Sequence, residues 1–72
     1  MLKLMVRTLP GCREDVAELL KNCSAESVVQ LPKDLERMDC AMEATFADAT
    51  ALDAAAAAIH LEYEGIAQAL PL

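Results

Sequence analysis

The sequence predicts a small α+β domain, because it mixes two periodicities in a definite order. Some stretches alternate apolar and polar residues one by one, which is typical of a strand with one buried face. Others repeat their apolar residues every three or four positions, which is typical of one face of a helix. With 72 residues, the chain has the length of one domain, which we expect to span residues 1–72.

The N-terminal third is expected to hold one strand and one helix. Over residues 2–8, leucine and valine alternate with lysine, methionine and arginine, and a Leu-Pro-Gly turn then ends this strand. From Cys12 the period becomes that of a helix, with acidic side chains early and Lys21 in the last turn, as the helix dipole favours. The face that this helix should bury consists of Cys12, Val16, Leu19, Leu20 and Cys23.

The middle of the chain predicts two more strands. Residues 27–31 are rich in valine and stop at Pro32, and the polar residues 33–37 then form a turn. From Met38 to Phe46, methionine, cysteine, alanine and phenylalanine occupy every second position, which is the clearest strand pattern in the sequence. We expect these side chains to face the core.

The C-terminal third predicts a second helix and a last strand. Asp48 or Thr50 can cap this helix, and the alanines at 54–58 have the highest helix propensity of any residue. Gly65 is a natural helix stop. Residues 66–70 then form a short strand before Pro71.

The resulting order, βαββαβ, predicts a ferredoxin-like fold: a four-stranded antiparallel sheet with both helices on one face. The first and third strands are then central neighbours. We expect Lys3 opposite Glu43 and Arg7 opposite Asp39 on the face that the helices leave open. Each such pair of opposite charges contributes about 0.2–1 kcal/mol.

A second interpretation makes the chain all-α. From Leu35 to Leu70, apolar and small residues also recur at alternating spacings of three and four, which would give one long C-terminal helix. The unbroken alternation from Met38 to Phe46 and the stop at Gly65 favour the strand interpretation.

Charge and composition limit the functions of the chain. A net charge of -6 repels phosphate backbones and anionic lipid, so we expect neither a nucleic-acid nor a membrane partner. No apolar run approaches the roughly 20 residues that cross a bilayer. The N-terminus lacks the features of a signal peptide, so the expected compartment is the cytoplasm. Three cysteines, an odd number, argue against a disulfide framework.

The candidate metal site centres on Cys12, which falls in the turn between the first strand and the first helix, four residues before Val16. This segment resembles the loop of heavy-metal-associated domains, which are ferredoxin-like copper and zinc carriers with a CxxC motif there. Leu9 stands where the first cysteine of that motif would be. The resemblance implies a divergent Cu or Zn site, for which a lone thiolate needs further ligands. Met38 and His60 are the candidates, since the fold brings them to the same edge.

No catalytic residue is predicted, and we expect a protein that is not an enzyme and has no other cofactor. Cys12 and His60 are one nucleophile and one base, but nothing in the sequence supplies an orienting group or an oxyanion hole. The glycines, Gly11 and Gly65, form no phosphate loop.

Two further resemblances involve ligand or peptide binding. The turn at residues 9–11 is similar to the loop of amino-acid-sensing ACT domains, which share this fold and bind effectors at dimer interfaces, although Leu9 replaces the expected acidic residue. Residues 48–70 are similar in pattern to small ferredoxin-like chaperones that bind signal peptides of redox enzymes. The first resemblance implies a small-ligand sensor at a dimer interface.

The leading prediction is a non-catalytic binding or regulatory module that acts through protein contact and self-association. The soft-metal carrier and the small-ligand sensor are the alternatives. The outer strands leave unpaired edges that a strand of a partner can join. The partner surface is expected on the open sheet face, at Met5, Val28, Ala41, Ala67 and Ala69.

Overall fold

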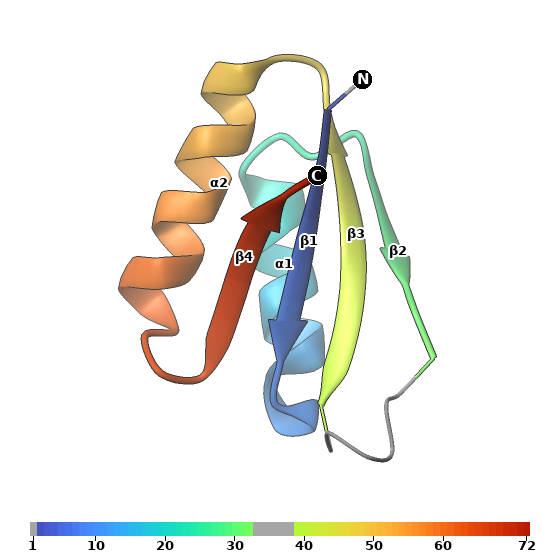
Figure 1. Ribbon diagram of the computed structural model, residues 1–72, viewed down its shortest axis with the longest axis vertical. Coiled ribbons are helices and arrows are strands. Elements are labelled where there is room, and N and C mark those ends of the chain that lie inside the picture. The colour runs from blue at the N-terminus through green and yellow to red at the C-terminus, as the bar shows by residue number, and fades with distance from the viewer. Residues whose placement is uncertain (1, 33–38) are drawn as a thin grey trace.

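The computed structural model describes residues 2–32 and 39–72, which form one sheet with α1 and α2 packed on the same side (Figure 1). The strand order is β2-β3-β1-β4, and all neighbours are antiparallel. This confirms the predicted ferredoxin-like α+β fold. In chain order the elements are β1 (Leu2–Thr8), a 3-10 turn η1 (Pro10–Cys12), α1 (Arg13–Asn22), β2 (Ser27–Gln30), β3 (Cys40–Phe46), α2 (Ala49–Glu62) and β4 (Ala67–Pro71).

The all-α interpretation is wrong, because residues 40–46 are a central strand and not part of a long helix. Strand β3 pairs with β1 on one side and with β2 on the other. The spacing of three and four that suggested a helix arises because a strand and a helix follow each other with apolar residues in both.

The core lies between the sheet and the two helices. Each large apolar side chain that is fully buried stabilises the fold by about 1.5–3 kcal/mol. The strands contribute alternate residues and the helices one face each, as the periodicities predicted. The fully buried apolar residues include Leu4, Val6, Val16, Leu20, Met42, Phe46 and Ile59. All three cysteines are free thiols, and Cys40 is buried.

The register between β1 and β3 differs from the predicted one by two residues. Met5, not Lys3, lies opposite Glu43, and Lys3 lies opposite Thr45. A shift of two residues leaves every side chain on the same face of the sheet, whereas a shift of one would invert them all. Alternation alone therefore predicted the faces and could not choose between these registers.

The predicted contact between Arg7 and Asp39 nevertheless forms, on a diagonal. Arg7 lies opposite Ala41, and its Nη1 is 3.4 Å from Oδ1 of Asp39. The long arginine side chain spans the two-residue offset.

Helix α2 begins at a side-chain cap and ends at a turn with a positive backbone angle. Oδ1 of Asp48 accepts a hydrogen bond from the Ala51 amide at 2.8 Å, so Asp48, and not Thr50, is the N-cap. After the helix, Gly65 has a φ of 77°, which glycine adopts without steric cost. In the described ranges, no helix is long and apolar enough to cross a membrane.

Candidate protein-contact surface on the sheet

One face of the sheet carries no helix in the described parts of the chain, and it faces the viewer in Figure 1. We call it the open face. Every second residue of each strand contributes to it, because the alternate residues point into the core. Its members are Ser27 and Val29 on β2, Ala41, Glu43 and Thr45 on β3, Lys3, Met5 and Arg7 on β1, and Gln68 and Leu70 on β4.

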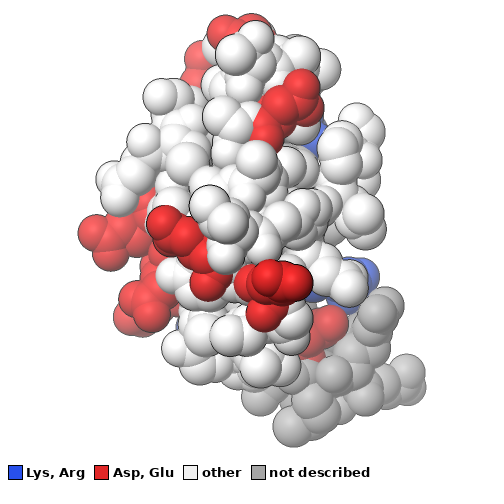
Figure 2. Space-filling model, turned by 90° about the vertical axis from the view of Figure 1, so that its left-hand side faces the viewer, with Lys and Arg blue, Asp and Glu red and all other residues white. Residues whose placement is uncertain are grey.

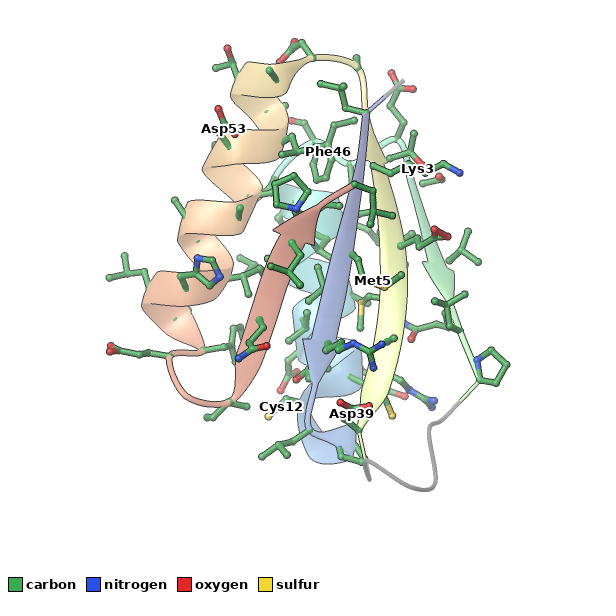
Figure 3. The ribbon with its side chains drawn as sticks, viewed as in Figure 1. Lys3, Met5, Cys12, Asp39, Phe46 and Asp53 are labelled. Atoms are coloured by element: carbon green, nitrogen blue, oxygen red, sulfur yellow. The ribbon has the colours of Figure 1, made fainter. Side chains whose placement is uncertain are left out.

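The central row of the open face is mostly apolar. The pairing places Leu70, Met5, Glu43 and Val29 side by side across the four strands. Leu70 is 57% exposed and Val29 is 53% exposed. The flexible thioether of Met5, at the middle of the sheet in Figure 3, can adapt to surfaces of different shape. This row is therefore a strip of apolar surface with one carboxylate in it.

Three of the predicted contact residues lie on the wrong side of the sheet. Val28 is opposite Ala44 and packs against the core. Ala67 and Ala69 face the helices and are 4% and 3% exposed. Strands β2 and β4 are short and carry apolar residues on both faces, so neither has a period from which its phase could be assigned.

Met5 and Ala41 lie on the open face, although Ala41 is only 9% exposed, and sequence reasoning missed Val29 and Leu70. The signal that could have placed them is the pairing of both strands with the central strands, since residues opposite each other share a face. Which residues of β2 and β4 face outward is thus determined by their pairing with β3 and β1, and not by the sequence of either outer strand alone.

One end of the open face is polar. The Arg7–Asp39 pair borders a shallow groove of about 320 Å³ that runs past Gly65 to Gln68. The two side chains are 34% and 18% exposed. A pair that is open to solvent on one side contributes at most about 1 kcal/mol to stability. The pair also fixes the position of the Arg7 guanidinium beside Asp39, at the lower end of the sheet in Figure 3.

The residues of the predicted metal site have separate surroundings. Cys12 is half-buried at the start of α1 and packs against the core. The imidazole of His60, in the last turn of α2, accepts a hydrogen bond at Nε2 from the Ala69 amide at 3.3 Å. Met38 lies outside the described residues. Within 2–32 and 39–72, no three His, Cys, Asp or Glu side chains are grouped as metal ligands, so the metal site stays a prediction.

The side of the molecule formed by α2 and β4 is acidic. Figure 2 shows several separate groups of Asp and Glu side chains on this side, within a largely uncharged surface, and Lys or Arg only at its margins. Partial burial, together with the carboxylates of Asp15 and Glu62, raises the pKa of Tyr63 above its ordinary value. Such a surface disfavours anionic ligands, in agreement with the net charge.

Comparison with known proteins gives the fold class. No family model matches the chain, and no curated protein matches it. Among solved structures, a PII-like signaling protein from Thermus thermophilus is similar, with a TM-score of 0.68 and 15% sequence identity over 99% of this chain and 85% of that chain. At this identity the likeness establishes the shared ferredoxin-like architecture. The resemblances to heavy-metal-associated and ACT domains stay predictions.

Proposed function

We propose that this protein is a non-catalytic regulatory module that acts through protein contact, self-associates, and presents its open face to a partner protein. The observation that carries the proposal is the central row of the open face. Val29 and Leu70, two large apolar side chains, are each more than half exposed at the two ends of this row, with Met5 next to Leu70 and Glu43 next to Val29. Exposed apolar strips framed by polar residues are typical of protein contact sites.

The partner chemistry follows from the charges around this row. Lys3 and Glu43 flank Met5, and Arg7 is already paired with Asp39. The open face is therefore close to electrically balanced, although the whole chain carries a net charge of -6. A partner with an apolar segment and few charges fits it, whereas a polyanion does not. The signaling role in the name of the structural neighbour supports a regulatory rather than a chemical task.

A cross-linking experiment tests this proposal. A photo-reactive residue at position 5, in natural cell extract, should cross-link one protein, which should also bind the purified chain. A Met5→Lys variant should no longer bind that protein, because lysine removes the apolar contact at the centre of the row. The fold should stay intact, because the new positive charge lies opposite Glu43. The matched control is Leu61→Lys, because Leu61 is 82% exposed on α2, on the other side of the sheet. Equal binding by both variants would contradict the proposal.

The two alternative functions have separate tests. A soft-metal carrier that uses Cys12 would bind Cu(I) or Zn²⁺ and lose affinity in Cys12→Ser. A sensor of the ACT kind would bind its small ligand only as a dimer, so a variant that stays monomeric should lose ligand binding. Neither alternative rests on an observation as direct as the apolar row.

A further inference from the structure

The two outer strands of the sheet differ in how their edges are protected. The Leu72 amide donates to the Lys3 carbonyl at 3.0 Å, which fixes the phase of the ladder between β4 and β1. The backbone groups of Ala67, Ala69 and Pro71 therefore point away from the sheet.

The outward donors on β4 are all accounted for. The Ala67 amide donates to the carbonyl of Tyr63 at 2.9 Å, and the Ala69 amide donates to Nε2 of His60 at 3.3 Å. Pro71 has no amide hydrogen. Strand β4 thus offers no free N–H to another strand, which is how natural edge strands avoid unwanted pairing.

The edge of β2 lacks this protection. The Leu31 amide donates to the Ala41 carbonyl at 2.9 Å, so the backbone groups of Val28 and Gln30 point outward. Among the residues that the structure describes, neither outward amide has a hydrogen-bond partner. Residues 27–32 also contain no charged side chain, although edge strands commonly carry one. This edge is therefore open to an added strand.

A groove of about 640 Å³ lies beside this edge, between β2 and the outer side of α1. Gln30 lines it from the strand, and Ala17 lies near the middle of the helix. Glu14 lies in the first turn of α1, next to Arg13, and Lys21 lies in the last turn, one turn after Glu18. Along the groove the charges are therefore positive, negative, negative and positive, and they sum to zero.

We propose that the β2 edge binds a second copy of this chain, antiparallel, about a two-fold axis that passes through Val29 perpendicular to the sheet. This inference rests on the proposed function and names its self-association contact. The two sheets join into one continuous sheet. Val28 exchanges both backbone hydrogen bonds with the partner's Gln30, and the symmetry repeats this exchange for Gln30 and the partner's Val28.

The side chains fit the same axis on both faces. On the open face, Val29 meets the partner's Val29, and the exposed valine becomes covered. On the helix face, the two-fold rotation reverses the direction of α1. Glu14 then approaches the partner's Lys21, Lys21 approaches the partner's Glu14, and Ala17 and Glu18 lie near the axis. A second copy supplies these two ion pairs and the matching valine, whereas a foreign strand would satisfy the backbone alone.

Sedimentation equilibrium over a range of concentrations tests the edge. Val29→Lys should weaken dimerisation at least about tenfold, because two lysines would lie directly opposite each other across the axis. Its matched control is Leu70→Lys, since Leu70 is similarly exposed on the same face of the other edge strand and the change in net charge is identical. We expect the control to dimerise as the wild type does. A strictly monomeric wild type, or equal weakening by both variants, would overturn the inference.

A charge exchange tests the identity of the partner and the axis. Glu14→Lys and Lys21→Glu should each weaken the dimer roughly several-fold, because each places like charges together at two symmetric positions. The double variant should recover wild-type affinity. If the double variant is no better than the single ones, the helices are not neighbours and the proposed axis is wrong. Circular dichroism checks that each variant is folded.

The outcomes separate this inference from the proposed function. If Glu14→Lys dimerises more weakly and still binds the cross-linked partner, the edge contact and the open-face contact are distinct and both stand, because Glu14 lies on α1 and not on the open face. If the wild type is monomeric but Met5→Lys loses the partner, the edge inference and the proposed self-association fail, while the open-face contact with a partner protein stands. If β2 instead takes a strand from a different protein, that protein should bind Met5→Lys and not Val29→Lys, while the wild type alone stays monomeric. That result again overturns the second copy as occupant.

Discussion

Tyr63, the single tyrosine of the chain, has a pKa that depends on the groups around it. It follows α2 and borders a shallow groove between the two helices, together with Asp15, Glu18 and Glu62. Partial burial raises the pKa of the phenol above the ordinary 10.0, and the carboxylates raise it further because they oppose a second negative charge. The neutral phenol is therefore favoured in the folded protein.

This gives a prediction for alkaline pH. The unfolded chain releases the phenol proton near pH 10, before the folded chain does, so the free energy of unfolding should fall as pH rises above 10. Absorbance titration of the phenolate should place its midpoint above 10.0. Asp15→Asn should lower that midpoint, and Tyr63→Phe should remove this part of the pH dependence. A wild-type midpoint at or below 10.0 would contradict the argument.

The same residue scale shows what the sequence could and could not predict. The burial of Met42 and Phe46 follows from alternation with a period of two, which belongs to β3 itself. The hydrogen bond from Ala69 to His60 does not, because it joins two elements whose relative position depends on the whole packing. From the sequence, His60 could only be proposed as a metal ligand or left in solvent.

At the scale of elements, strand pairing was the part that sequence patterns specified least. Both helices and all four strands were predicted close to their observed bounds, since each ends at its own stop signal and all but β2 and β4 also have a clear period. The register of β1 against β3 was off by two residues, and Val28 was placed on the wrong face. Both errors concern how one strand pairs with its neighbour, and the alternation within one strand carries no information about the register of that pairing.

The protection of β4 gives a prediction at this scale. His60→Ala should remove the acceptor of the Ala69 amide and leave that donor open to water at the edge. A hydrogen bond of this kind contributes about 0.5–1.5 kcal/mol, so hydrogen exchange at Ala69 should accelerate by roughly two- to tenfold. The Ala67 amide, which donates to the Tyr63 carbonyl, is the internal control and should not change. Equal acceleration at both amides would indicate that α2 as a whole has loosened, and not only that the hydrogen bond from Ala69 to His60 has been lost.

At the scale of the whole molecule, the two edges of the sheet differ, because only the β2 edge can pair with a further strand. The β4 edge is closed by a carbonyl, an imidazole and a proline, while the β2 edge is uncharged and offers two free amides among the described residues. A closed edge opposite an open one allows two copies to pair and then stops, because the dimer presents only its two β4 edges. In the proposed dimer, the acidic side formed by α2 and β4 lies at the opposite edge of the sheet from the junction between the copies, where its charge would keep dimers apart.

This architecture predicts that stability depends on protein concentration. Only the folded chain forms the dimer, so a higher protein concentration shifts the equilibrium away from the unfolded state and raises the melting temperature. Each hundredfold excess over the dissociation constant adds about 2.7 kcal/mol in the simplest case of one ligand site. Thermal unfolding of the wild type and of Leu70→Lys should therefore shift to higher temperature as concentration rises, and that of Val29→Lys should shift much less over the same range. A melting temperature of Val29→Lys that rises in parallel with the wild type would place the contact elsewhere on the molecule.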